Sequence, residues 1–418
     1  MNFNEFGFDS RIIAGVNACG YQTPTPIQQE TIPSAMRGLD IMGLAQTGTG
    51  KTAAFALPVM HRLLTGPRGT LRALVVAPTR ELAEQICEGF RSLGRNTKLQ
   101  VTTIYGGVGM KPQVQTLRRG VDIVVACPGR LLDHVRQGTI NLRNISIAVL
   151  DEADMMLDMG FLPDVRAIMA KLPAKRQNMM FSATMPEDIC ALSSDMLDAP
   201  HVAKIRHSKP IETVAHALYP VTQQLKTPLL LALLLSTDSE SVLIFTRTKH
   251  RAKKLGTLLV QNGHRAASLQ GNLSQSARQA ALEGFRRGQY SVLVATDIAA
   301  RGIDVSQVSH VINYDFPTTV DAYTHRIGRT GRASRPGDAF SLVTREDEIV
   351  IRQIERVLGS NIQRCSIDGF DYKQAAPPSV GRDAPPRHRV SAPRHRVSAP
   401  GHRDPATART RGRRDARR

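Results

Sequence analysis

The chain has 418 residues, more than one ordinary domain needs and enough for two domains that each bury a core. Its 55 Lys and Arg outnumber 36 Asp and Glu, and the net charge of +19 favours a polyanionic partner, either nucleic acid or an anionic membrane surface. No run approaches the roughly 18 apolar residues of a membrane span, and the five scattered cysteines form no Cys-x-x-Cys pair, so we expect a cytoplasmic protein without disulfide or zinc site.

Short apolar runs alternate with helical stretches along most of the chain. Runs of this kind, each followed by turn or polar residues, are typical of parallel strands buried on both faces. They are residues 74–77, 123–126, 147–150 and 179–181, followed by 242–245, 292–295, 311–313 and 339–343. This rhythm predicts an α/β protein with two successive domains, residues 1–206 and 214–374, joined by a linker at 207–213.

The segment AQTGTGKT at residues 45–52 has the pattern of a phosphate loop between a strand and a helix, except that Ala45 stands where the pattern begins with Gly. Glycines let backbone amides approach phosphate oxygens, Lys51 is expected to reach the β and γ phosphates, and the Thr52 hydroxyl is offered to Mg²⁺. A Gly-rich turn with a chance Lys-Thr pair is the alternative. The residues predicted to contact the nucleotide here are Ala45, Gln46, Thr47, Gly48, Thr49, Gly50, Lys51 and Thr52.

An acidic string, Asp-Glu-Ala-Asp at residues 151–154, directly follows the apolar run 147–150. Open α/β sheets bind ligands at the carboxyl ends of their strands. We therefore predict that Asp151 holds Mg²⁺ and that Glu152 orients or deprotonates an attacking water. A solvated acidic turn is the alternative, which the phosphate loop a hundred residues upstream disfavours.

A basic segment, HRIGRTGR at residues 325–332, lies in the second predicted domain. It could be a plain basic surface loop. An NTPase, however, needs positive charge at the γ-phosphate, and Arg329 and Arg332 are candidates for that task. If these arginines come from the second domain and Lys51 from the first, hydrolysis requires the two domains to close.

The composition changes sharply at about residue 375. Residues 375–418 contain twelve Arg, no Lys and three Asp, a net charge of +9, and PRHRVSA at 386–392 recurs at 393–399. With so few apolar residues the segment cannot offset its ordering entropy, so we predict a disordered tail. It could tether a nucleic acid without sequence preference or only aid solubility; membrane binding ranks lower, because no hydrophobic anchor accompanies it.

Together, and in this order and spacing, the motifs make the sequence resemble the bacterial type of DEAD-box RNA helicase, in helicase superfamily 2. The resemblance runs from about Phe3 to Val343. It implies two tandem RecA-like domains, ATP and Mg²⁺ as cofactors, and RNA-stimulated ATP hydrolysis. It also implies that closure of the domains drives local, non-processive strand separation or remodelling of ribonucleoprotein.

Further roles follow only from this resemblance. The segment 20–28 looks like the family's Q motif, which implies that Gln28 reads the adenine edge with help from Tyr21 and Phe3. The Ser182 and Thr184 hydroxyls would couple hydrolysis to strand separation by bonding Asp154 or His325. In segment 295–304, the resemblance places Asp304 near the ribose, the Gly302 backbone near the γ-phosphate and Thr296 near RNA.

The resemblance also implies which residues face RNA, where arginines pair with phosphates and glycines allow close backbone approach. In the first domain they are the segment 78–83, with Pro78, Thr79 and Arg80 as its site residues, together with Gly106, Gly107, Pro128, Gly129 and Arg130. In the second domain they are the segment 275–278, with Gln275 and Arg278 as its site residues, together with Thr296. One departure is Cys127, where the family usually has Thr before Pro-Gly-Arg. If that Thr contacts RNA through its hydroxyl, one hydrogen bond is lost.

The expected partner is single-stranded RNA or a short duplex, in settings such as ribosomal or messenger-decay assemblies. The chain has no Trp and only 5% aromatic residues, so base stacking should contribute little and the core should show little sequence preference. The choice of RNA over DNA comes from the resemblance alone. Two rival functions are a processive DNA translocase and an ATP-gated RNA clamp or scaffold with negligible turnover.

Overall fold

The computed structural model describes residues 2–46, 48–205, 214–237, 240–300, 308–331 and 337–373. By its internal contacts the chain divides into Met1–Gln374 and Ala375–Arg418. The second unit, and with it the prediction about the tail, lies outside the described residues, as does the whole of the predicted linker 207–213.

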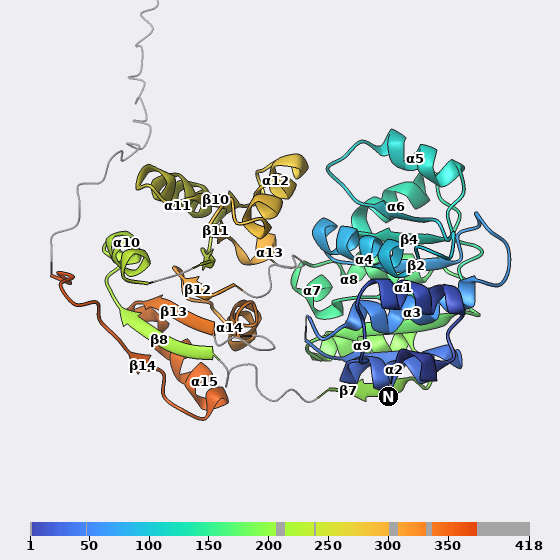
Figure 1. Ribbon diagram of the computed structural model, residues 1–418, viewed down its shortest axis with the longest axis horizontal. Helices are drawn as coiled ribbons and strands as arrows, with labels where there is room; N and C mark the ends of the chain where they lie inside the picture. The colour runs from blue at the N-terminus through green and yellow to red at the C-terminus, as the bar shows by residue number, and fades with distance from the viewer. Residues whose placement is uncertain are drawn as a thin grey trace, which may run out of the picture. The chain divides into compact units, whose positions relative to one another are not determined.

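Within the first unit, two parallel sheets of seven strands form, as the alternating pattern predicts. We call the part built on the first sheet, residues 2–205, the first lobe, and the part built on the second, residues 214–373, the second lobe. Helices cover both faces of each sheet (Figure 1). No helix in the described ranges combines the length and apolar character needed to cross a bilayer.

The first sheet has the order β3-β4-β2-β5-β6-β1-β7, and all its pairings are parallel. The strands are β1 (Ile41–Leu44), β2 (Ala73–Val76), β3 (Val101–Ile104), β4 (Ile123–Ala126), β5 (Ile147–Leu150), β6 (Gln177–Ser182) and β7 (His201–Lys204). The helices are η1 (Phe3–Phe6), α1 (Ser10–Ala18), α2 (Pro26–Met36), α3 (Lys51–Leu63), α4 (Arg80–Leu93), α5 (Met110–Arg118), α6 (Pro128–Arg136), α7 (Ala153–Asp158), α8 (Leu162–Met169) and α9 (Glu187–Met196).

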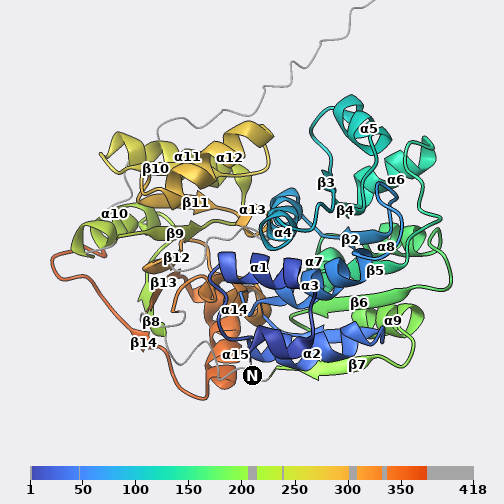
Figure 2. The ribbon, with the colours of Figure 1, turned by 45° about the vertical axis from the view of Figure 1, so that its right-hand side comes forward.

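Successive residues of the central strands enter two different cores, because side chains alternate between the faces of a strand. Val75 and Val149 pack with residues of α1 to α4 on one face. Leu74 and Leu150 pack with residues of α6 to α9 on the other. α2 lies against β1 and β7 (Figure 2). Burial on both faces explains why these strands read as uninterrupted apolar runs.

The second sheet has the order β10-β11-β9-β12-β13-β8-β14, again with parallel pairings. The strands are β8 (Val214–Pro220), β9 (Val242–Phe245), β10 (Ala266–Leu269), β11 (Val292–Ala295), β12 (His310–Asn313), β13 (Gly337–Val343) and β14 (Gln363–Arg364). The helices are α10 (Lys226–Ser236), α11 (Lys249–Gln261), α12 (Gln275–Arg286), α13 (Asp297–Ala300), α14 (Val320–Ile327), η2 (Arg345–Asp347) and α15 (Glu348–Leu358).

The strand order decides which loops meet. In the first sheet β5, β6 and β1 are neighbours. Since all three are parallel, the phosphate loop after β1, the acidic string after β5 and the segment after β6 lie at the same edge of the sheet. Motifs separated by up to about 140 residues in the sequence are thereby gathered at one site.

Candidate nucleotide and nucleic-acid site

The phosphate loop runs directly into α3, which begins at Lys51. Gly48 and Gly50 have φ of 81° and 92°, in the left-handed region that favours glycine. A Cβ atom on Gly50 would lie 2.5 Å from the Gln28 Nε2 atom, so this glycine also permits a close approach. Lys51 is buried, and its Nζ donates to the Ala45 carbonyl at 2.9 Å. The ammonium keeps two further protons for phosphate oxygens.

The departure at Ala45 has a structural explanation. Its amide donates to the Ser182 carbonyl at 3.0 Å, which ties the start of the loop to the end of β6. Ala45 is not among the non-glycine residues with positive φ, and its side chain is buried in the first core. The position therefore does not need glycine. Of the other predicted loop residues, Thr49 donates its hydroxyl to the Gln46 carbonyl at 2.8 Å, and Thr47 lies outside the described residues.

The acidic pair follows β5 in a strained backbone. Glu152 has φ of 53° and ψ of 56°, a conformation that costs a non-glycine residue free energy and is often found at functional sites. The Glu152 amide donates to the Asp151 Oδ1 atom at 3.0 Å. Both side chains are buried, and among the described residues the Glu152 Oε2 atom has no hydrogen-bond partner. Glu152 therefore presents one buried acceptor oxygen, Oε2, that no described residue satisfies.

Burial also sets the electrostatics of this pair. It raises the pKa of Glu152 to about 7, with the Lys51 ammonium opposing the shift and Asp151 adding to it. Burial likewise raises the pKa of Asp151, again opposed by Lys51. A carboxylate with a pKa near neutrality can accept and release a proton readily. These surroundings suit a general base beside an oxygen ligand for a cation.

Asp154 anchors the loop after β6. Its Oδ2 atom accepts from the Thr184 amide at 2.8 Å, the Thr184 hydroxyl at 3.0 Å and the Ala183 amide at 3.1 Å. The Asp154 amide donates to the Ser182 hydroxyl at 3.2 Å, which donates in turn to the Thr184 carbonyl at 2.7 Å. The structure thus joins the end of the acidic string to the Ser-Ala-Thr segment. Their role in coupling stays a prediction.

Gln28 lies beside the phosphate loop as part of a capping box at the start of α2. Its Oε1 atom accepts from the Thr25 amide at 2.9 Å, and its Nε2 atom donates to the Gly50 carbonyl at 3.0 Å. A carboxamide has two acceptor sites and two donor hydrogens. One of each is therefore left for the adenine edge that the resemblance assigns to Gln28.

The aromatic residues beside it are not isolated from one another. The ring centroids of Phe3 and Tyr21 are 6.2 Å apart, and those of Phe3 and Phe6 are 6.0 Å apart. Phe3 is buried, whereas Tyr21 is 42% exposed. Phe3 is thus held by aromatic packing of the N-terminal turn, and Tyr21 offers the more accessible ring.

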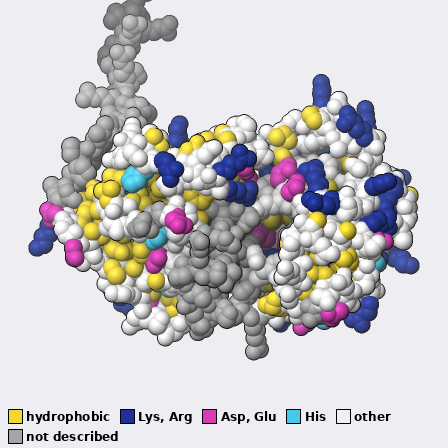
Figure 3. Space-filling model, in the orientation of Figure 1, with side chains coloured by type: hydrophobic (Ala, Val, Ile, Leu, Met, Phe, Trp, Pro, Cys, Tyr) yellow, Lys and Arg dark blue, Asp and Glu magenta, His cyan; other side chains and the backbone are white. Residues whose placement is uncertain are grey.

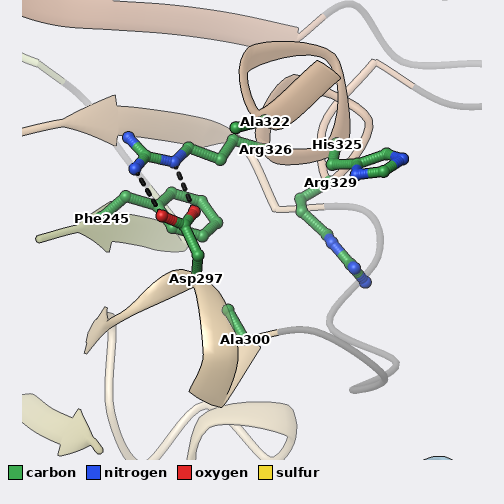
Figure 4. Close-up of a pocket in the computed structure, with 7 residues that line it drawn as sticks. All are labelled: Phe245, Asp297, Ala300, Ala322, His325, Arg326 and Arg329. Atoms are coloured by element: carbon green, nitrogen blue, oxygen red, sulfur yellow. Dashed lines mark hydrogen bonds and ion pairs between the residues drawn. The ribbon is translucent and has the colours of Figure 1, made fainter. Parts of the chain in front are cut away.

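In the second lobe, α14 carries His325, and Arg329 follows the helix. Both line a pocket together with Phe245, Asp297, Ala300, Ala322 and Arg326 (Figure 4). Arg332, Gly302 and Asp304, which the sequence predicts at the nucleotide, lie outside the described residues. Sequence reasoning assigned no role to Asp297 or Arg326, although both stand inside the motif segments that it singled out.

Three of the predicted RNA-facing residues, Arg80, Gln275 and Arg278, are linked in a network with Glu81, which lies inside the predicted segment 78–83. The Glu81 Oε1 atom accepts from the Arg278 Nε atom at 2.7 Å and from the Gln275 Nε2 atom at 3.4 Å. The Gln275 Oε1 atom accepts from the Arg80 Nη1 atom at 3.3 Å. The sequence places Glu81 in the RNA-facing segment 78–83, but its role as the partner of Arg278 becomes visible only in the structure.

Further predicted RNA-facing residues lie close to Arg80. Gly107 has φ of 78°, and a Cβ atom there would lie 2.1 Å from the Arg80 Nη1 atom, so the arginine packs directly on this glycine. A Cβ atom on Gly106 would lie 3.7 Å from Arg80 Nη2. The Arg130 Nη1 atom donates to the Val108 carbonyl at 3.0 Å. Figure 3, in the orientation of Figure 1, shows Lys and Arg side chains on the surface over α5 and α12.

The remaining predicted residues sit at element ends. The Thr79 hydroxyl caps α4 by accepting from the Leu82 amide at 3.3 Å, and the preceding Pro78 is buried. Pro128 and Gly129 form the first turn of α6. Thr296 is partly exposed and directly follows β11. Each of them is therefore at the end of a strand or the beginning of a helix.

Cys127 is the cap residue of α6, and its side chain makes no capping hydrogen bond. The Cys127 amide donates to the Ile104 carbonyl at 2.8 Å, so its backbone is fixed independently of the side chain. Burial raises the pKa of the thiol to about 12, which keeps it protonated and unreactive at neutral pH. The usual Thr would supply a capping oxygen that this thiol does not.

Replacing Cys127 with Thr is therefore expected to stabilise the first lobe. A Thr hydroxyl at this position can accept from an amide of the first turn, a contribution of about 1 kcal/mol. Thermal unfolding followed by circular dichroism should show a Tm about 2–4 °C higher. Cys190→Thr, on the exposed face of α9, is the matched control and should not raise Tm. An unchanged or lower Tm for Cys127→Thr contradicts the capping argument.

Comparison with known proteins agrees with these motifs. The profile of the DEAD/DEAH box helicases matches residues 25–192, and that of the helicase conserved C-terminal domain matches residues 225–334. The ATP-dependent RNA helicase DeaD of Buchnera aphidicola subsp. Baizongia pistaciae (strain Bp) is 41% identical over 373 residues, 89% of this chain. The chain spans 62% of that relative's length.

Solved structures extend the likeness to nearly whole chains. A DEAD box protein from the hyperthermophile Methanococcus jannaschii is 36% identical, with a TM-score of 0.51 over 88% of this chain and 99% of that one. S. cerevisiae Dbp5 bound to RNA and ADP BeF3 is 30% identical, with a TM-score of 0.78 over 87% of this chain and 95% of that one. The chain therefore belongs to the DEAD-box helicase family.

Proposed function

We propose that this protein is an ATP-dependent RNA helicase, in which RNA-stimulated ATP hydrolysis drives local, non-processive strand separation or remodelling of ribonucleoprotein. One observation carries the proposal. The phosphate loop with Lys51, the buried pair Asp151 and Glu152, and the Asp154–Thr184 contact meet at one edge of the first sheet. A binding module would need the phosphate loop but not a buried base beside it.

The residues present fit a Mg²⁺ ion bound together with nucleotide. Asp151 supplies a buried carboxylate whose positive neighbour is Lys51, and Thr52 supplies a hydroxyl in the first turn of α3. The described residues contain no group of three or more His, Cys, Asp or Glu arranged to hold a metal by themselves. That suits Mg²⁺, which is usually held by one or two protein oxygens, phosphates and water. When bound, it would neutralise charge on the phosphate oxygens.

Each side chain of the site has a step to perform. Lys51 contacts the phosphates through the protons that its bond to Ala45 leaves free. Glu152 orients and deprotonates the attacking water, since its Oε2 atom is buried without a partner in the described protein. Arg329, and Arg332 from the residues not described, offset negative charge that develops at the γ-phosphate.

RNA binding completes the proposed cycle. Arg80, Arg130 and Arg278 provide guanidinium groups for phosphates, and Gly107 lets the backbone approach. RNA and ATP together would stabilise closure of the lobes, and phosphate release would reopen them. Because these groups contact the phosphates of the RNA and not its bases, we expect little sequence preference. A cytoplasmic protein acting within ribosomal or messenger-decay assemblies is part of the proposal.

The test is ATP hydrolysis by the full chain with and without single-stranded RNA, alongside strand separation of short RNA and long DNA duplexes. RNA-stimulated turnover with preference for the short RNA duplex supports the helicase. Unwinding of a long DNA duplex as readily as the short RNA one favours a DNA translocase. Negligible single-turnover hydrolysis with RNA bound favours a clamp or scaffold.

Removing residues 375–418 is expected to raise the KM for RNA and flatten its salt dependence, because the segment carries a net charge of +9 and phosphate contacts release counterions. Turnover at saturating RNA should stay nearly unchanged. The measurement is RNA-stimulated hydrolysis at several salt concentrations. As a matched control, a variant with the twelve arginines of this segment changed to glutamine should behave like the truncation. An unchanged KM for RNA at low and moderate salt contradicts the tether.

A further inference from the structure

Asp297 and Arg326 of the second lobe form a two-pronged ion pair (Figure 4). The Arg326 Nε atom donates to Asp297 Oδ1 at 2.6 Å, and its Nη2 atom donates to Asp297 Oδ2 at 2.8 Å. The arginine side chain is 4% exposed and the aspartate 32%. The pair joins α13, which begins at Asp297, to α14, which carries Arg326.

The remaining nitrogen of the Arg326 guanidinium, Nη1, also donates hydrogen bonds. It donates to the Asn313 Oδ1 atom at 2.8 Å and to the Asp315 carbonyl at 2.7 Å. The central carbon of the guanidinium lies 4.9 Å from the centre of the Phe245 ring. Arg326 thus connects both helices to the carboxyl ends of β12 and β9. Lysine, with a single ammonium, cannot make this planar fork of bonds.

Arg329 follows three residues later, and its backbone is held on both sides. The Arg329 amide donates to the Arg326 carbonyl at 3.1 Å, and its carbonyl accepts from the Val308 amide at 3.2 Å. The Thr330 hydroxyl then donates to the Val308 carbonyl at 2.6 Å. In Figure 4 the Arg329 side chain extends away from the Asp297–Arg326 pair. The backbone of Arg326 therefore helps to fix the position of the Arg329 backbone.

We propose that Asp297 and Arg326 are positioning residues for Arg329, and that they link its placement to the RNA contact at Thr296. The inference rests on the proposed function, in which Arg329 acts at the γ-phosphate. Thr296 directly precedes Asp297, so a shift of the backbone at Thr296 reaches the carboxylate that holds Arg326. RNA binding and the catalytic arginine are then connected through one ion pair.

The test is a double-mutant cycle on the full chain, with Asp297→Asn, Arg329→Ala and both together. Asparagine keeps the shape of the side chain and removes its charge. With saturating single-stranded RNA and ATP, Asp297→Asn should lower kcat about 10–100-fold, as expected for a misplaced catalytic group. The KM for ATP should change by less than about threefold, and Asp297→Glu should recover part of kcat. In the Arg329→Ala background, single-turnover hydrolysis should fall by no more than about twofold on adding Asp297→Asn.

Asp338→Asn is the control, since it removes the ion-pair partner of His310 elsewhere in the second lobe and should leave kcat unchanged. The positioning role is overturned if the rate losses of Asp297→Asn and Arg329→Ala multiply in the double variant. It is also overturned if Asp297→Asn lowers Tm but leaves kcat unchanged. If Asp297→Asn does not fold, Arg326→Lys, which keeps the charge but not the fork, must show the same loss of kcat and the same cycle. If Arg329→Ala keeps full turnover, the proposed role of Arg329 is refuted. If Arg329→Ala loses turnover but Asp297→Asn keeps it, only the positioning role is refuted.

Discussion

Glu152→Gln is expected to lower kcat for RNA-stimulated ATP hydrolysis by about 10²–10⁴-fold, the range for loss of a general base. Glutamine preserves the size of the side chain, and the backbone at this position is fixed by the contacts of Asp151 and Asp154 on either side. The substitution removes the negative charge of Glu152 and, with it, the capacity to take a proton from water. The KM for ATP should therefore change little, because Lys51 and the phosphate loop are untouched.

Steady-state hydrolysis at saturating ATP and RNA, with nucleotide binding measured separately by fluorescence, checks this result. Glu88→Gln is a matched control, since Glu88 lies on the exposed surface of α4 with 68% of its side chain accessible. It should retain full turnover. Wild-type turnover in Glu152→Gln would show that another group activates the water.

Arg329→Ala is expected to lower kcat by about 10³-fold or more, as removal of an arginine finger does in related phosphoryl-transfer sites. Arg329 is 7% exposed and close enough to the acidic pair that its positive charge lowers the pKa of Glu152. A charge placed in such a buried site is little screened by water, so its loss should raise the free energy of the transition state.

The measurement is kcat and the KM for ATP and RNA, together with binding of a γ-phosphate analogue. Loss of kcat with nearly unchanged KM indicates an interaction made in the transition state. Arg352→Ala, on the exposed surface of α15 where the side chain is 75% accessible, is the control and should be neutral. Equal losses in both variants would point to a general effect of charge and not to a finger.

The central strands could be predicted from the sequence, and several outer ones could not. Runs such as 123–126 and 147–150 coincide with β4 and β5, because strands covered on both faces need apolar residues throughout. β3, β7 and β8 have exposed or half-exposed positions and therefore carry Thr, His or Lys within the strand. Their patterns resemble those of loops until the neighbouring strand is known.

The phosphate loop, the acidic string and the basic segment of the second lobe were determined by the sequence itself. Their chemistry depends on residue types at fixed spacing, such as glycines whose positive φ is a local property. Such patterns can be recognised in the sequence without any knowledge of distant contacts. The overall α/β class follows for a similar reason, since burial on both faces marks each strand separately.

Only the tertiary structure showed which groups depend on one another. The contact of Glu81 with Arg278 and the two-pronged ion pair of Arg326 with Asp297 join residues that are distant in sequence. The burial of Glu152 Oε2 without a partner among the described residues also depends on the fold. Hydrogen bonds and desolvation act over a few ångströms in space, and the strand order decides which residues come that close. The sequence therefore determined what chemistry the chain carries, and the fold determined which side chains hold it in place.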